Sequence, residues 1–192
     1  MMKTILIPMA NGNEDIELIT IIDILIRAKN SGANLDIILA SITDNLDITL
    51  DTGLKIMANK TLDKVNTENI DAIALAGGFL GMTNLKNDKR IKNIIQKLNS
   101  QNKLIAAICA SPIVLANAGV LTGDFTCYPG CEKDINANRI DKAVVVNKNI
   151  ITSAGPITST YFALTIIKEL GFIEQYEGLL EGLLINKFGI KF

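Results

Sequence analysis

The chain is 192 residues long, and its 19 Lys and Arg residues nearly balance its 20 Asp and Glu residues. Because there is no basic surplus and no long run of one sign, we expect neither nucleic acid nor an anionic membrane surface as a partner. No apolar stretch approaches the ~20 residues that span a bilayer, and the amino-terminal segment turns polar too soon for a signal peptide. These features predict a cytoplasmic protein.

Hydrophobic residues make up 48% of the chain, whereas aromatic residues make up only 5%. A core of this composition is built mainly from Ile, Leu, Val and Ala, as is common in layered α/β proteins. A chain of this length can bury one sizeable core, so we expect residues 1–192 to form a single domain.

The three cysteines, Cys109, Cys127 and Cys131, are an odd number in a chain of this size. This argues against a disulfide framework and fits a reducing compartment. The spacing of Cys127 and Cys131 has no second pair, and the chain contains no histidine to complete a zinc site, so we expect no metal. These two cysteines can be read as incidental or as a redox pair, and the incidental reading is favoured.

The first half of the chain alternates apolar runs with a helical pattern. Apolar residues at helical spacing between Ile16 and Arg27 predict a helix that stops near Gly32. Alternating residues around Asp51-Thr52-Gly53 predict a small β-hairpin. The expected elements are a strand at Lys3–Met9, the helix, a strand at Leu35–Ala40 and the hairpin over Asp47–Ala58.

The second half continues the alternation of strands and helices. The expected elements are strands at Asp71–Ala76, Leu104–Ile108, Ala143–Val146 and Ile150–Thr152, helices at Asp88–Asn99 and from Ser111, an irregular stretch over Gly123–Ile140, and a final long helix from near Pro156. This rhythm predicts an α/β fold with a mostly parallel sheet and helices on both faces.

The stretch LIAAICASP places Cys109 where an apolar strand gives way to a helix that begins with Ser111 and Pro112. We expect the Ser111 hydroxyl to cap this helix, and the helix to lower the pKa of the thiol. Sites in such sheets lie at the carboxyl ends of the strands. The loop from Asn11 to Glu17, the turn Gly77-Gly78, Cys109 and the turn Gly155-Pro156 should therefore open on one edge.

The absence of histidine excludes every Cys-His and Ser-His-Asp mechanism carried by this chain alone. Protons must then move through a carboxyl group, and the loop before the first helix offers Glu17. Beside a thiolate and away from water, its pKa would rise and the group would stay protonated. The alternatives remain open that Cys109 is a structural cysteine, that Glu17 is a solvated residue at a helix start, and that Gly77-Gly78 is only a turn.

The segments KTILIPMANGNEDIEL, DAIALAGGFLG, LIAAICASP and ITSAGPITS together resemble the ThiJ/PfpI family, which includes the Parkinson-disease protein deglycase. The resemblance extends from Lys3 to about Gly171. It implies a flavodoxin-like three-layer sandwich, a homodimer, a reactive cysteine at Cys109 and a glutamate at Glu17 that touches its sulfur. It also implies backbone donors at Gly78 and Ala110, with Gly77, Tyr128, Gly155 and Pro156 around the substrate.

One departure from the family pattern lies at Tyr128, where many members carry a histidine. A tyrosine donates a hydrogen bond but is no base near neutral pH, so a protease-like Cys-His pair is not expected. The resemblance implies a cofactor-independent glyoxalase or deglycase acting on methylglyoxal, glyoxal or their adducts. The alternative is a redox-responsive stress protein or chaperone in which Cys109 is oxidised, up to sulfinic acid, without significant turnover.

Overall fold

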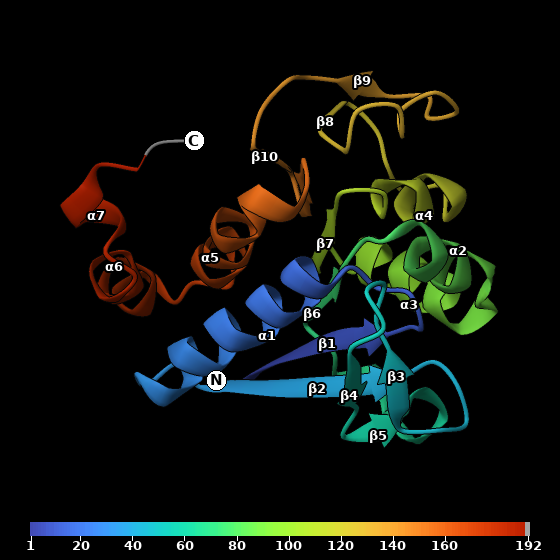
Figure 1. The fold of residues 1–192 in the computed structure, drawn as a ribbon, viewed down its shortest axis with the longest axis horizontal. Coiled ribbons are helices and arrows are strands. Elements are labelled where there is room, and N and C mark those ends of the chain that lie inside the picture. The colour runs from blue at the N-terminus through green and yellow to red at the C-terminus, as the bar shows by residue number, and fades with distance from the viewer. Residues whose placement is uncertain (191–192) are drawn as a thin grey trace.

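The computed structural model describes residues 1–190, and its centre is a sheet of seven strands in the spatial order β10-β11-β7-β6-β1-β2-β5 (Figure 1). Every neighbouring pair in this sheet is parallel except β10, which is antiparallel to β11. The strands are β1 (Lys3–Met9), β2 (Leu35–Ser41), β5 (Lys60–Thr61), β6 (Ala72–Leu75), β7 (Leu104–Ile108), β10 (Val144–Asn147) and β11 (Ile150–Ser153).

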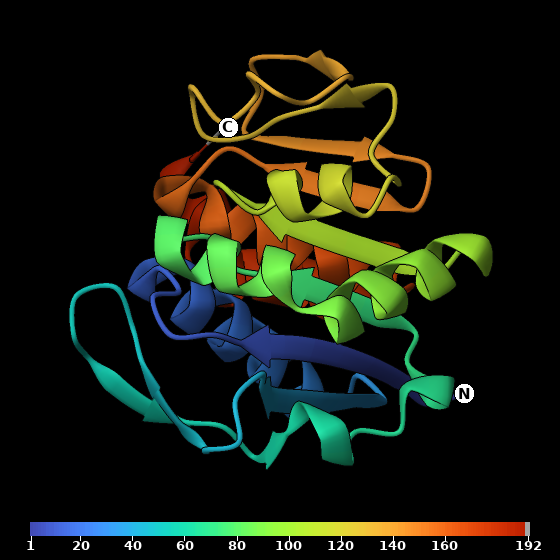
Figure 2. The same cartoon turned by 90° about the vertical axis from the view of Figure 1, so that its right-hand side faces the viewer.

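Helices cover both faces of this sheet, so its central strands are buried on both sides (Figure 2). Ile5 and Ile7 of β1 belong to one hydrophobic cluster, while Leu6 between them belongs to the other. Successive strand residues point to opposite faces, which explains why these strands read as unbroken apolar runs. On the first face lie α1 (Asp15–Asn30) and α5 (Ser159–Glu169); on the second lie α2 (Phe79–Asn87), α3 (Lys89–Ser100) and α4 (Pro112–Asn117).

The remaining elements lie outside these three layers. They are the hairpin β3 (Asp47–Thr49) and β4 (Lys55–Met57), the short pair β8 (Asp124–Phe125) and β9 (Asn138–Arg139), the helices α6 (Ile173–Gly182) and α7 (Ile185–Phe188), and the 3-10 turns η1 (Leu62–Lys64), η2 (Thr67–Asn69) and η3 (Pro156–Thr158). The hairpin contacts the loop after β1, because the Gly12 N–H donates to the Thr49 carbonyl at 2.8 Å.

The predicted strands, the hairpin, and the helices at α1, α3 and α4 are confirmed; α2 was not predicted, and two expectations are wrong. The final long helix is instead η3, α5, α6 and α7, interrupted at Gly171, whose φ of 92° lies in the left-handed region. Ser111 precedes α4 but does not cap it, because its hydroxyl donates to the Ala76 carbonyl at 2.7 Å instead.

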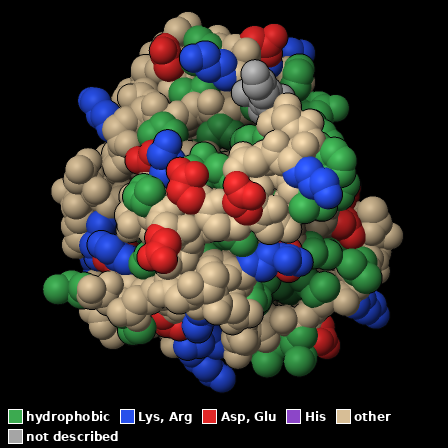
Figure 3. Space-filling model, turned by 90° about the vertical axis from the view of Figure 1, so that its left-hand side faces the viewer, with side chains coloured by type: hydrophobic (Ala, Val, Ile, Leu, Met, Phe, Trp, Pro, Cys, Tyr) green, Lys and Arg blue, Asp and Glu red, His purple; other side chains and the backbone are tan. Residues whose placement is uncertain are grey.

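The surface carries mixed charge. Figure 3 shows one face on which acidic, basic and hydrophobic side chains are interspersed rather than gathered by sign. Among residues 1–190, no helix has both the length and the apolar character that crossing a membrane requires.

Candidate active site

Cys109 lies at the sharp turn between β7 and α4, at the carboxyl ends of the central strands. Its φ of 63° is in the left-handed region, which costs a residue other than glycine about 1–3 kcal/mol. Two neighbouring chain segments hold it there. The Cys109 N–H donates to the Ser153 carbonyl at 2.9 Å, and the Tyr128 N–H donates to the Cys109 carbonyl at 2.9 Å. Cys109 as a residue is 9% exposed.

Glu17 projects from the first turn of α1 into the protein and is fully buried. Its Oε2 accepts a hydrogen bond from the Gly77 N–H at 2.7 Å, and the carboxyl group also interacts with the Cys109 thiol. Within the described residues, Oε1 is buried and has no hydrogen-bond donor. A buried carboxylate oxygen without a donor is unfavourable, whereas a neutral carboxyl group can carry its proton on that atom.

The two side chains compete for one negative charge. Burial raises the pKa of Glu17 to about 7, although the Cys109 and Gly77 hydrogen bonds oppose the rise. Burial, followed by the charge of Glu17, also raises the pKa of the Cys109 thiol, while the N–H groups of Ala110 and Gly78 lower it. The N–H group of Ala110, just before the helix, acts in the expected direction, but burial and the charge of Glu17 outweigh it, so the expected net lowering of the thiol pKa is wrong.

Gly77 and Gly78 follow β6 and fit between the other site segments. A Cβ atom at Gly77 would lie 2.6 Å from Glu17 Oε2 and 2.7 Å from Cys109 Cβ. A Cβ atom at Gly78, where φ is 83°, would lie 2.2 Å from the Gly12 carbonyl oxygen and 2.7 Å from the Glu14 nitrogen. Any side chain at either position would displace its neighbours, so the two glycines do more than form a turn.

Asn13 joins two of the loops, and the sequence analysis did not single it out. Its side chain is fully buried; Oδ1 accepts from the Ala10 N–H at 2.7 Å, and Nδ2 donates to the carbonyls of Ala76 and Gly77 at 3.2 and 3.1 Å. The Ala76 carbonyl also accepts from the Ser111 hydroxyl. These hydrogen bonds link the chain segments that follow β1, β6 and β7. The only signal in the sequence is a polar loop, and nothing there distinguishes Asn13 from Asn11.

Tyr128, Gly155 and Pro156 form the other side of the site. Tyr128 is 45% exposed, and its ring lies 3.3 Å from the position a Cβ atom would take at Gly155. Gly155 accepts from the Thr158 hydroxyl at 2.8 Å, which stabilises the turn η3 that begins at Pro156. Tyr128 therefore lies at the rim rather than in the interior, and it provides no base in place of histidine.

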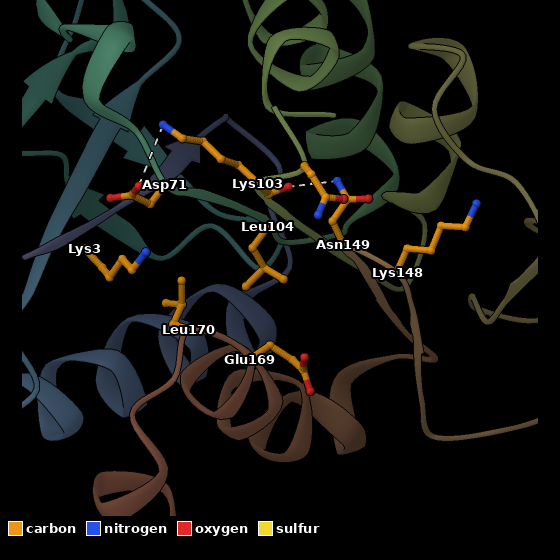
Figure 4. A pocket seen from close by; sticks show the side chains of 9 residues that line it. Lys3, Asp71, Lys103, Leu104, Lys148, Asn149, Glu169 and Leu170 are labelled. Atoms are coloured by element: carbon orange, nitrogen blue, oxygen red, sulfur yellow. Dashed lines mark hydrogen bonds and ion pairs between the residues drawn. The ribbon is translucent and has the colours of Figure 1, made fainter. Parts of the chain in front are cut away.

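A separate hollow of about 540 Å³ lies at the opposite end of the sheet, where the strands begin (Figure 4). Charged side chains, including Lys3, Lys103 and Glu169, line it, and Lys103 pairs with Asp71 at 3.8 Å. No thiol lines it, so it is distinct from the Cys109 site. Among the described residues, no cluster of three or more His, Cys, Asp and Glu side chains is arranged to hold a metal ion.

Known proteins resemble this chain over most of its length. Dj-1beta of Drosophila melanogaster is 32% identical over 189 residues, covering 96% of this chain and 98% of that protein. A deglycase of Pyrococcus horikoshii is 38% identical over 151 residues, covering 77% and 87% of the two chains. DJ-1 homolog B of Arabidopsis thaliana is 36% identical over 186 residues, which is 95% of this chain but only 40% of that protein.

Comparison with solved structures finds one of the same relatives. The crystal structure of Drosophila DJ-1beta superposes with a TM-score of 0.89 and 32% identity, covering 96% of this chain and 98% of that one, so the flavodoxin-like sandwich is established. The model of the DJ-1/PfpI family matches residues 3–169. The chain therefore belongs to the DJ-1/PfpI family.

Proposed function

We propose that this protein is a cytoplasmic, cysteine-dependent glyoxalase or protein deglycase that acts on methylglyoxal, glyoxal or their adducts without a cofactor. The observation that carries the proposal is the fully buried Glu17 carboxyl group, which has one undonated oxygen and interacts with the thiol of Cys109. The name of the Pyrococcus relative, a deglycase, supports the same class of chemistry.

The geometry suggests how methylglyoxal would react. The Cys109 sulfur adds to the aldehyde carbon, and the carbonyl oxygen is stabilised by the N–H groups of Gly78 and Ala110 and takes the proton of Glu17. The Glu17 carboxylate then removes the hydrogen from that carbon, and the ketone oxygen takes up this proton to give an enediol. The carboxylate next takes the proton of the first hydroxyl group and delivers it to the neighbouring carbon, which leaves a 2-hydroxy thioester. Water hydrolyses the thioester to lactate and frees the thiol. One carboxyl group serves every proton transfer, as a chain without histidine requires.

Lactate formation by the purified protein tests this proposal. We expect lactate from methylglyoxal with the native protein, and none above background with Cys109→Ser, which keeps the size of the side chain but is a far weaker nucleophile. Thermal unfolding of both proteins checks that the variant is folded. Equal lactate formation by the two proteins would refute Cys109 as the nucleophile, and no lactate from either would refute the activity.

The same site also supports the alternative, a redox-responsive protein whose Cys109 is oxidised. A sulfinate at Cys109 would lie beside the N–H groups of Gly78 and Ala110 and could accept the proton of a neutral Glu17. This reading predicts a stable oxidised Cys109 in a protein with no lactate formation, so the lactate assay separates the two functions.

We also propose that the protein is a homodimer. Large apolar side chains are exposed on neighbouring elements beside the site: Ile16 on α1 is 57% exposed, Leu80 on α2 is 56% exposed, and Ile157 on η3 is 81% exposed. Large apolar side chains exposed in this way are typical of subunit interfaces. Light scattering is expected to give close to twice the chain mass of 20.8 kDa, and a monomeric mass would refute the dimer.

A further inference from the structure

Two thiols outside the proposed active site occupy the loop after β8. Cys127 is fully buried and Cys131 is 6% exposed, and both belong to the hydrophobic cluster on the face covered by α2, α3 and α4. The Cys131 N–H donates to the Tyr128 carbonyl at 3.0 Å. This bond closes a turn that brings Cys131 back beside the residue that follows Cys127.

Polar groups suited to thiol chemistry surround Cys127. Its Sγ donates to Glu132 Oε2 at 3.8 Å, and the same oxygen accepts from the Gly130 N–H at 2.7 Å. Arg139 Nε lies 3.7 Å from this oxygen; it is buried and has no hydrogen-bond acceptor within residues 1–190. Burial, with the charge of Glu132 adding to it, raises the pKa of the Cys127 thiol to about 11, whereas the Arg139 cation acts in the opposite direction.

Cys131, in contrast, is accessible from a cavity. It lines a hollow of about 500 Å³ formed by α2, α4 and the loop after β8. The lining combines apolar side chains, among them Phe79 and Ile113, with two cations and one acid, Lys86, Lys133 and Asp134, so that its charged side chains carry a net positive charge. A small molecule that carries carboxylates and some apolar surface matches this lining.

We propose that Cys131 and Cys127 form a second reactive site, in which a low-molecular-weight disulfide bearing carboxylates oxidises the two thiols to an intramolecular disulfide. This inference goes beyond the proposed function and does not depend on it. Cys131 is the attacking thiol because it faces the cavity, and Cys127 is the resolving thiol because it is buried next to Glu132.

The exchange proceeds in two steps that balance. The Cys131 sulfur, after losing its proton to solvent, attacks one sulfur of the disulfide RSSR and forms the mixed disulfide Cys131–S–SR; the departing thiolate takes up a proton as RSH. The Cys127 sulfur then attacks the Cys131 sulfur and gives up its proton. The second RS group leaves as a thiolate and receives that proton. In total, two thiols and one RSSR give one protein disulfide and two RSH.

The experiment uses the full chain with Cys109→Ser, so that the proposed nucleophile does not react. The reduced protein is equilibrated with oxidised glutathione at about pH 8.5, where thiols ionise appreciably, and is then alkylated and cleaved with trypsin. All three cysteine positions lie in one tryptic peptide, residues 104–133. We expect this peptide to lose two hydrogen atoms, to take up no alkyl groups and to recover both thiols on reduction. Two alkylated thiols, or a stable glutathione adduct, would overturn the proposal.

Single variants in the same background test the order of attack. Cys127→Ser should accumulate the mixed disulfide on Cys131, because the resolving thiol is missing. Cys131→Ser should remain unmodified, because Cys127 does not reach the cavity. The opposite pattern would overturn the assignment. Since serine is close to cysteine in size, thermal unfolding serves as the folding control, and the result with both thiols present stands even where a variant fails to fold.

The cations supply a further control. Lys86→Gln with Lys133→Gln should slow the reaction with oxidised glutathione by about tenfold at low ionic strength, and leave the rate with neutral hydroxyethyl disulfide unchanged. Equal effects on both reagents would show that the charged cavity does not bind the disulfide, and would overturn that part of the proposal.

Discussion

Glu17→Gln should remove the fall in stability with rising pH that the titration of Glu17 causes. Burial raises the pKa of this carboxyl group from 4.5 to about 7 in the folded protein. Over that interval the folded state holds a proton that the unfolded state has released, so the free energy of unfolding falls as the pH rises and levels off above the folded-state pKa. A rise of this size corresponds to about 3 kcal/mol at ~1.4 kcal/mol for each pKa unit.

Glutamine keeps the shape of the side chain and an oxygen that can accept the Gly77 N–H, but it does not titrate. Relative to the native protein, the variant should therefore gain up to about 3 kcal/mol between about pH 5 and pH 8. Because Glu17 is fully buried, solvent screening does not reduce this figure. The pair Cys109→Ala and Cys109→Ala/Glu17→Gln is the matched control, since it removes the titration of the thiol.

Urea unfolding followed by circular dichroism measures both pairs at each pH. The reasoning is refuted if the two curves of free energy against pH run parallel, or if the native protein becomes more stable than the variant as the pH rises. Either result would mean that Glu17 is already ionised near its ordinary pKa, and that the shared charge described for the site does not exist.

Three further predictions concern the site. The kcat/KM for methylglyoxal should rise with pH through an apparent pKa near 7, because below it both Glu17 and Cys109 are protonated; a flat profile between about pH 5 and 9 would contradict this. Hydrogen peroxide should add oxygen to Cys109 before Cys127 or Cys131, since Cys109 is the most exposed of the three and its sulfur has two backbone N–H donors; peptide mass spectrometry showing the reverse order would contradict it. Asn13→Ala should lower the free energy of unfolding by on the order of 2 kcal/mol, because it leaves buried backbone groups unpaired; a neutral effect in urea would show that water replaces the side chain.

The strands were predictable because a parallel strand buried on both faces must be apolar throughout. Leu104–Ile108 is such a strand, and its residues alternate between the two hydrophobic clusters. The helix α2 was not predictable in the same way. It begins after Gly78, whose φ is 83°, and its Gly81 packs so closely on Asn13 that a Cβ there would lie 2.6 Å from the asparagine Nδ2. A glycine favoured by such a contact weakens the helical pattern, because it replaces an apolar side chain.

The carboxyl ends of the strands could be placed together from topology alone, but the contacts among them could not. Gly77 and Glu17 are 60 residues apart in the sequence, and the hydrogen bond between them depends on how α1 packs on the sheet. Asn13 illustrates the same limit, because its importance comes from the carbonyls of Ala76 and Gly77 that the folded chain brings above it. The sequence predicts which side chains lie at this edge of the sheet, whereas their hydrogen-bond partners depend on how the folded chain packs.

The thiol shows why the sign of an electrostatic effect requires the structure. A helix N-terminus stabilises a nearby anion by about 0.3–1 kcal/mol, and α4 has only six residues with which to do so. Burial of an ionisable group can shift its pKa by several units and acts in the opposite direction. In this protein burial exceeds the contribution of the helix, so Cys109 does not ionise on its own. In the proposed mechanism a thiolate at Cys109 therefore forms only while Glu17 holds a proton, which would make the acid a requirement for the nucleophile.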